Sequence, residues 1–215
     1  MTSIAILIPT LKRPYRLAPL VENIHKTTTI PHKIYFMTGD IESQQILDEL
    51  NETCFVDHGD TWPNRINALF HKTMEPYVFL CSDDSWFHPG WDSIAMERME
   101  DIDGIVVVND LHNPNGTLAL VSRNYIDTMS GCIDTPNVVI YPGYKHNYSD
   151  GELFCTARIR GKWAQCTDSI VEHLHPHAGK APHDEVYAMG DAWNDGDAAT
   201  FASRTHLWDD IHPSQ

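Results

Sequence analysis

Two adjacent carboxylates, Asp83 and Asp84, follow an apolar run from Val78 to Cys81, with Ser82 between them and the run. An apolar run of this kind is typical of a buried, parallel strand. Acids at the carboxyl end of such a strand lie where open α/β sheets bind their ligands. Because adjacent carboxylates repel each other, they favour a divalent cation such as Mg²⁺ or Mn²⁺, which takes oxygen ligands and often bridges to phosphates. Ser-Asp-Asp-Ser is also good turn chemistry, so an acidic turn without a ligand is the alternative.

A third carboxylate, Asp150, stands just ahead of a predicted helix over residues 152–160, which ends at Gly161. As a helix cap it would stabilise the fold by about 1 kcal/mol. A carboxylate on a loop that faces a cleft can also take a proton from an attacking hydroxyl, as a general base. The sequence leaves both roles open, and one residue can have both.

A pair of histidines, His173 and His175, lies in a predicted strand over residues 169–175. Alternate residues of a strand share one face, so the two imidazoles point the same way. Neutral imidazoles suit Mn²⁺ or Zn²⁺ better than Mg²⁺. The pair therefore predicts either a metal ligand or a polar surface.

Other polar side chains have two interpretations each. Arg13 follows the first predicted strand, where a cation could meet a phosphate or lie in a solvated turn. Asn64 and Asn67 are three residues apart on a predicted helix, so they share a face and could bind a nucleotide or face water. A solvated acidic loop, rather than a cation site, is expected for the tail acids Asp191, Asp195 and Asp197.

The first half of the chain alternates strand and helix patterns, which indicates a parallel sheet built from βαβ units. The second half is less regular. We predict one α/β domain over residues 1–215, with a mostly parallel central sheet flanked by helices. The predicted strands are 4–8, 33–37, 54–56, 78–81, 104–108, 116–121, 138–141 and 169–175, and the predicted helices are 15–25, 43–50 (capped by Ser43), 63–72, 123–129, 152–160 and one near 198–207.

The composition limits the possible functions. With 42% hydrophobic residues, the 215-residue chain can build a sizeable core. Its formal net charge of -15 opposes non-specific binding to nucleic acid or anionic lipid.

Five scattered cysteines without a CxxC pair predict reduced thiols. The sequence carries neither a transmembrane run nor a basic leader, which predicts a cytoplasmic protein (of the host cytoplasm if viral) with no membrane partner.

Read in order, these motifs resemble the nucleotide-sugar glycosyltransferases of the GT-A fold, of the broad family 2 type. The stretch 4–14, with Pro9-Thr10 and Arg13-Pro14, is similar to the opening strand of that family. The helix 64–69 is similar to the one that carries an Asn ahead of the metal strand. The stretch 79–91 is similar to the acidic metal motif with its trailing Pro-Gly-Trp, and Asp150-Gly-Glu-Leu with Gly161 to the later acidic motif. The resemblance covers about residues 4–185.

This sequence departs from the family at two places. After the second strand the family usually has an acidic pair that binds the base, whereas this chain has Met37-Thr-Gly-Asp40. Thr156 also stands where the later motif commonly carries an arginine. These departures concern the contacts to the nucleotide and the sugar.

The resemblance implies a divalent-metal-dependent (Mn²⁺ or Mg²⁺), Rossmann-like transferase that uses a nucleotide-diphosphate sugar, with a UDP-sugar favoured. Asp84 and His173 or His175 would hold the metal. Asp150 would deprotonate the acceptor hydroxyl, with inversion at the anomeric carbon. Residues 1–110 would form the donor half, 111–190 the acceptor and catalytic half, and 191–215 a tail. The donor contacts would come from Pro9, Thr10, Arg13, Asp40, Asn64, Asn67 and Asp83.

The sequence leaves more than one acceptor and more than one reaction class open. A soluble hydroxyl acceptor is expected, either a glycan or a hydroxylated DNA base. A nucleotidyltransferase or other sugar-nucleotide enzyme would share the acid pair, but it should carry a glycine-rich phosphate loop where this chain has Leu11-Lys-Arg-Pro14. A non-catalytic carbohydrate- or metal-binding module would use the aromatic loop 141–148 to stack on sugar rings.

Overall fold

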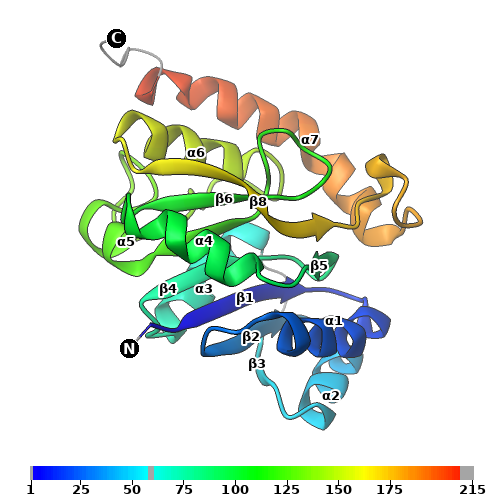
Figure 1. Ribbon diagram of the computed structural model, residues 1–215. Helices are drawn as coiled ribbons and strands as arrows, with labels where there is room; N and C mark the ends of the chain where they lie inside the picture. Colours follow the sequence, from blue (N-terminus) through cyan, green and yellow to red (C-terminus); the bar gives the residue numbers. More distant parts are fainter. Residues whose placement is uncertain (1, 58–60, 209–215) are drawn as a thin grey trace.

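The computed structural model describes residues 2–57 and 61–208, which form an α/β domain around one twisted sheet (Figure 1). The sheet has eight strands in the order β3-β2-β1-β4-β7-β6-β8-β5. The strands are β1 (Ile4–Thr10), β2 (His32–Thr38), β3 (Thr53–Val56), β4 (Tyr77–Leu80), β5 (Ser85–Phe87), β6 (Ile105–Asn109), β7 (Ala119–Ser122) and β8 (Trp163–His173).

Most strand pairs are parallel, as predicted. β1 pairs in parallel with β2 and β4, β2 with β3, and β6 with β8. β7 runs antiparallel to both of its neighbours, and β5 runs antiparallel to β8. The carboxyl ends of β1, β4 and β8 therefore meet at one edge of the sheet, where the predicted acid pair and histidines lie.

Helices cover both faces of the sheet. Alternation along β1 turns Ile4, Ile6 and Ile8 toward one face and Ala5 and Leu7 toward the other. The first face packs against α1, α2 and α4, and the second against α3, α5 and α6. The helices are α1 (Pro14–Thr27), α2 (Ile41–Glu49), α3 (Trp62–Lys72), α4 (Trp91–Glu100), α5 (Arg123–Met129), α6 (Ser149–Ile159) and α7 (Glu185–Arg204), with short 3₁₀ turns η1 (Pro176–Ala178) and η2 (Thr205–Leu207).

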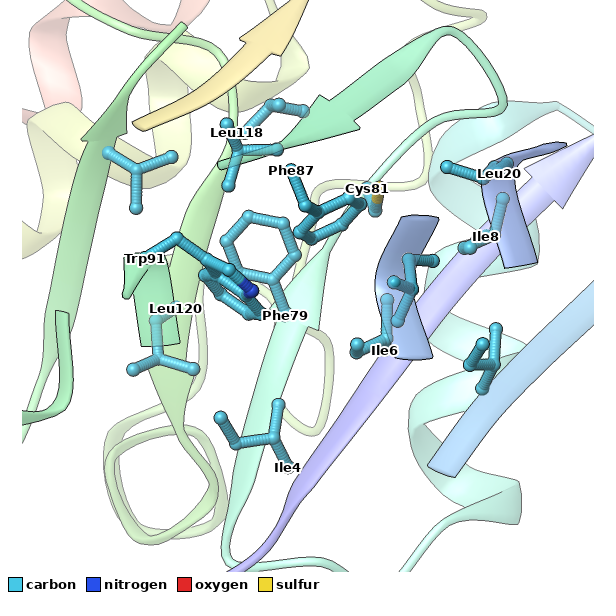
Figure 2. Close-up of a cluster of buried hydrophobic side chains, with 14 of the residues drawn as sticks. Ile4, Ile6, Ile8, Leu20, Phe79, Cys81, Phe87, Trp91, Leu118 and Leu120 are labelled. Atoms are coloured by element: carbon cyan, nitrogen blue, oxygen red, sulfur yellow. The ribbon is translucent and has the colours of Figure 1, made fainter. Parts of the chain in front are cut away.

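An aromatic cluster supports the strand that leads into the turn with the acid pair. Phe79 of β4 lies with its ring centroid 4.5 Å from that of Trp91, and Phe87 of β5 lies 5.0 Å from Trp91 (Figure 2). All three side chains are buried beside Ile6 of β1. Because such a core is close-packed, it holds the turn between β4 and β5 in a defined position.

Several predicted elements have different boundaries in the structure. Asp40, not Ser43, caps α2, because its carboxylate accepts a hydrogen bond from the backbone N–H of Ser43. Residues 138–141 form no strand, since the backbone of Val139 and Ile140 bonds to a side chain of α3. β8 begins at Trp163, six residues before its predicted start. β5 and α4 have no counterpart among the predicted elements.

The predicted tail is largely helical. α7 is a 20-residue helix that begins at Glu185, earlier than the helix predicted near 198–207. It lies beside α6 at one side of the molecule (Figure 1, orange to red). In the part of the chain that the structure describes, no helix combines the length and apolar character needed to cross a bilayer.

Candidate active site

A cavity of about 690 Å³ lies at the carboxyl ends of β1 and β4. Its wall is formed by the end of β1, the acid turn after β4, the loop 112–118, the first turns of α6, the end of β8 and one face of α7. Eight of the eleven predicted site residues line it: Pro9, Thr10, Arg13, Asp83, Asp84, Asp150, His173 and His175. The fold thus gathers residues from four separate segments of the chain around one space.

Asp83 is buried and bonded through both carboxylate oxygens. Thr10 donates its hydroxyl to Oδ2 at 2.8 Å, and Nη1 of Arg13 donates to Oδ1 at 2.9 Å. A buried carboxylate needs such a charge partner and hydrogen bonds to offset its desolvation. Asp83 therefore anchors the turn to the end of β1.

Asp84 presents its carboxylate to the cavity in an ionised state. Ser82 donates its hydroxyl to Oδ1, Tyr187 donates to Oδ2 at 2.7 Å, and Nε2 of His173 lies 3.2 Å from Oδ1. Burial opposes ionisation, but the positive charge on His173 and these hydrogen bonds outweigh it and hold the pKa of Asp84 well below its usual range. The carboxylate is therefore ready to bind a cation.

The imidazole of His173 is oriented from its far side. Thr117 donates its hydroxyl hydrogen to Asp110 at 2.8 Å, and its oxygen lies 3.3 Å from Nδ1 of His173. With that hydroxyl hydrogen committed to Asp110, the Thr117 oxygen accepts the Nδ1 hydrogen. Nε2 is thereby turned toward Asp84. Burial alone would lower the pKa of His173, yet the neighbouring Asp84 raises it.

His175 has a different environment. Its ring stacks on His112 with the centroids 5.9 Å apart and meets Tyr187 edge-on at 4.9 Å. Burial and the charge on His173 lower the pKa of His175 to about 4. Nδ1 of His175 accepts a hydrogen bond from the backbone of His177 at the start of η1. Of the two predicted histidines, the structure thus places His173 against the Asp84 carboxylate.

The donor atoms in the cavity fit a divalent cation that also binds substrate. Oδ1 of Asp84 and Nε2 of His173 supply one carboxylate oxygen and one imidazole nitrogen, a donor set that suits Mn²⁺. No group of three or more acidic, histidine or cysteine side chains is arranged around a common point in residues 2–57 and 61–208. The protein would therefore supply two ligands, leaving the other positions to phosphate oxygens and water.

Asp150 lines the same cavity, in the first turn of α6. The N-cap of this helix is Tyr148, so Asp150 is not the cap that its sequence position suggested. Oδ1 accepts a hydrogen bond from the Gly151 N–H at 2.9 Å. Burial raises the pKa of Asp150 to about 6, against the opposing effects of this backbone contact and of His173. A pKa close to neutrality suits a general base.

Three predicted donor-binding residues lie outside the cavity wall: Asp40, Asn64 and Asn67. Asp40 is bonded to its own turn, where it accepts hydrogen bonds from the backbone N–H of Lys12 at 2.7 Å and of Ser43 at 2.8 Å. The amide of Asn67 is buried and binds the backbone of Val139 and Ile140. In this structure Asp40 and Asn67 therefore shape the surrounding loops.

The tail acids only partly match the expected solvated loop. Asp191 and Asp195 are exposed on α7. Asp197, in contrast, is buried and accepts three backbone hydrogen bonds of 2.7–2.8 Å from residues 145–147, so the expectation is wrong for this residue. The loop that Asp197 holds leads directly into the first turn of α6.

Tyr187 lines the cavity and Asp184 binds the lining residue Arg13, although the sequence pattern indicates neither role. Asp184 binds Arg13 through two hydrogen bonds, and the ring of Tyr187 lies 3.9 Å from the Arg13 guanidinium. The local sequence offers a helix-capping signal at Asp184. That signal does not indicate that the first turn of α7 contacts Arg13 and Asp84, which lie more than 100 positions earlier in the sequence.

Comparison with known proteins identifies the class of fold. No family model and no curated protein matches the sequence. Among solved structures, a mannosyltransferase from Pyrobaculum calidifontis, in complex with GDP-Man and Mn²⁺, matches 82% of this chain with a TM-score of 0.65 and 10% identity. Glucosyl-3-phosphoglycerate synthase from Mycobacterium tuberculosis, in complex with Mn²⁺, UDP and glucosyl-3-phosphoglycerate, matches 94% with a TM-score of 0.69 and 11% identity.

A third structure, residues 1–349 of TarS from S. aureus, matches 80% of the chain with a TM-score of 0.61 and 8% identity. The matches cover 58% of the mannosyltransferase chain, 59% of the TarS chain and 80% of the synthase chain. At these identities the likeness concerns architecture. The chain has the GT-A type of fold, as the sequence resemblance predicted.

Proposed function

We propose that this protein is a metal-dependent glycosyltransferase that moves a sugar from a nucleotide-diphosphate sugar to an acceptor hydroxyl. The observation that carries the proposal is the contact between Asp84 and His173 on the wall of a cavity that also holds Asp150. Two structures of similar architecture bind Mn²⁺ together with GDP-Man or UDP, which supports this class of reaction.

Asp84 and His173 would hold the cation. When bound, a divalent cation neutralises the charge that develops on the leaving diphosphate. It would also offset the repulsion between an anionic donor and a protein with a formal net charge of -15. Arg13 cannot replace it, because Asp83 and Asp184 already compensate its charge.

Asp150 would act as the general base. Its carboxylate takes the proton of the acceptor hydroxyl, the hydroxyl oxygen bonds to the anomeric carbon, and the nucleoside diphosphate leaves from the opposite face. The configuration at that carbon is therefore inverted. Because the pKa of Asp150 is about 6, the carboxylate is mostly ionised at pH 7 and still basic enough to accept the proton.

The donor would lie against the end of β1. Pro9, Thr10 and Arg13 line the cavity on this side, together with Trp62 at the start of α3. The half-buried Trp62 ring offers an aromatic face for a nucleobase. We propose a UDP-sugar as the donor to test first, because the structure with a TM-score of 0.69 binds UDP.

The acceptor would lie beside α6 and α7. Tyr148, Trp193 and Phe201 line this part of the cavity and can stack on a sugar ring or a base. In the same predicted aromatic loop, the Tyr141 ring instead lies 3.5 Å from the Arg204 guanidinium, and Tyr144 donates its hydroxyl to Glu152. Either of the expected acceptors, a glycan or a hydroxylated DNA base, would offer such a sugar ring or base. None of the five cysteines, all of them in the described part of the chain, forms a disulfide, which supports a reducing, cytoplasmic location.

Isothermal titration with UDP- and GDP-sugars, with and without Mn²⁺, tests the donor. Metal-dependent binding of a nucleotide sugar supports the proposal, and its absence overturns it. Labelled donors offered with glycans, proteins and hydroxymethylated DNA then identify the acceptor. Release of pyrophosphate from a nucleoside triphosphate would instead identify a nucleotidyltransferase, and sugar binding that is indifferent to nucleotide would identify a binding module.

A further inference from the structure

The first turn of α7 reaches the carboxylate of Asp84. The hydroxyl of Tyr187 donates to Oδ2 of Asp84 at 2.7 Å, while Oδ1 is the oxygen nearest to Nε2 of His173. Tyr187 is buried, with 7% of its surface exposed. Thus a residue of α7 binds one oxygen of the carboxylate that would hold the cation.

The direction of the Tyr187 hydrogen is fixed by its neighbours. Nη1 of Arg16 donates to the phenol oxygen at 3.1 Å, which leaves the single phenol hydrogen free to point elsewhere. The possible acceptors are Oδ2 of Asp84 at 2.7 Å and the carbonyl of Leu174 at 3.3 Å. The charged and nearer oxygen makes the stronger hydrogen bond, so the hydrogen goes to Asp84.

The ring of Tyr187 is held independently of its hydroxyl. It lies under the guanidinium of Arg13 at 3.9 Å, and Asp184 clamps that guanidinium with two hydrogen bonds of 2.8 Å. Asp184 also caps α7 by accepting from the backbone N–H groups of Val186 and Tyr187. A phenylalanine at this position would therefore keep its packing and lose the two hydrogen bonds of the hydroxyl, the one donated to Asp84 and the one accepted from Arg16.

We propose that Tyr187 is a positioning residue of the metal site, which it serves by fixing the orientation of the Asp84 carboxylate. With Oδ2 bound to the phenol, Oδ1 is presented next to Nε2 of His173, where the two protein ligands can meet one ion. The inference rests on the proposed function, because it assigns the cation to Asp84 and His173. Loss of a residue that orients a metal ligand typically lowers metal affinity 10- to 100-fold.

The test compares two variants that each lose one phenol hydroxyl. Tyr187→Phe removes the hydrogen bond to Asp84, and Tyr35→Phe removes a hydrogen bond of 2.8 Å to Glu75, outside the cavity wall. Mn²⁺ is titrated into the wild type and both variants by calorimetry, with and without UDP. We expect Tyr187→Phe to bind Mn²⁺ about 10- to 100-fold more weakly and Tyr35→Phe to match the wild type.

The outcomes separate this inference from the proposed function. If the wild type binds no Mn²⁺ in either condition, the proposed function fails. If it binds and Tyr187→Phe binds equally well, the inference fails. Tighter binding by Tyr187→Phe also overturns it, because the phenol would then compete with the cation for Asp84. Thermal melting verifies that the variants are folded. Asp184→Asn is a second variant. It weakens the two hydrogen bonds to Arg13, although asparagine can still cap α7. Weaker Mn²⁺ binding is expected for this variant too.

Discussion

Arg13 and Asp184 form a double hydrogen bond, with Nε and Nη2 each 2.8 Å from a carboxylate oxygen, although 171 residues separate them in the sequence. Nη1 of the same guanidinium binds Asp83 at 2.9 Å. One buried arginine therefore ties the end of β1 to both the acid turn and the start of α7. A buried cation between two carboxylates compensates charges that would otherwise be costly to desolvate.

Removal of the Arg13 charge should strongly destabilise the protein. Arg13→Met leaves Asp83 buried without its cation, for which we expect a loss of about 3–5 kcal/mol in the free energy of unfolding. Arg98→Met is the control, because Arg98 and Asp101 form an exposed ion pair worth about 0–1 kcal/mol. Urea denaturation at pH 7 measures both. Losses of similar size in the two variants would contradict the charge-compensating role of Arg13.

Asp84→Ala should abolish sugar transfer and leave the fold intact, since the cation loses its carboxylate ligand. Turnover over a range of Mn²⁺ concentrations, together with the melting temperature, tests this. Asp168→Ala is the control, since Asp168 is an exposed acid of β8. Near-normal turnover of Asp84→Ala at low Mn²⁺ would disprove the assignment, and unfolding of the variant would indicate a structural turn.

Asp150→Asn should lower the rate of transfer by about 10²–10⁴-fold, because the amide cannot accept the proton. In the wild type, kcat/KM should fall about tenfold for each pH unit below the Asp150 pKa of about 6, as the base becomes protonated. A pH–rate profile with saturating Mn²⁺ measures this. A wild-type profile that is flat between pH 5 and 7 would exclude Asp150 as the base.

The same pKa has a consequence for stability. Because the pKa of Asp150 in the folded protein lies above its ordinary value of 3.8, the folded state binds the proton more tightly than the unfolded chain. This stabilisation is complete below pH ~4 and is lost as the pH rises through about 6. Asparagine does not ionise, so the Asp150→Asn variant does not lose this stability as the pH rises. We therefore expect the variant to be more stable than the wild type at pH 7 and not at pH 4. Denaturant titrations at both values test the sign.

Asn67→Ala should destabilise the protein without changing donor affinity. The side chain makes three hydrogen bonds of 2.8–3.1 Å to the backbone of Val139 and Ile140, and their loss in a buried position should cost about 3 kcal/mol. Asn115→Ala, at an exposed asparagine, is the control for stability. Weaker nucleotide binding by a stable Asn67→Ala protein would instead support the role in donor binding that its sequence position suggested.

Asp197→Ala should lower kcat more than it changes KM for the donor. Its carboxylate holds the backbone of residues 145–147, which lead into the helix that carries Asp150. The loss of three charge-assisted hydrogen bonds should also cost about 3 kcal/mol of stability. Asp195→Ala, an exposed acid of the same helix, is the matched control. Equal behaviour of the two variants would show that the loop does not depend on Asp197.

The sequence by itself determined the position of the acid pair and the class of fold. The apolar runs of β1 and β4 predict buried parallel strands, and Asp83 and Asp84 follow shortly after β4, so short-range pattern alone places them at the carboxyl edge of the sheet. Asp150 was found in the same way, from a helix start. Its environment was not predictable, because burial, and hence the pKa near 6, depends on segments distant in the chain.

Only the tertiary structure decided which residues complete the site. Asn67 lies three residues from Asn64 on a helix, yet its amide is bonded to a loop 72 and 73 residues later. Tyr187 contacts Asp84 across 103 residues, and Asp197 reaches back to the loop before α6. Such contacts leave no period or spacing in the sequence, because they depend on how α7 packs against the sheet edge. Local pattern fixes where a strand ends, whereas the long-range packing of helices fixes which side chains meet there.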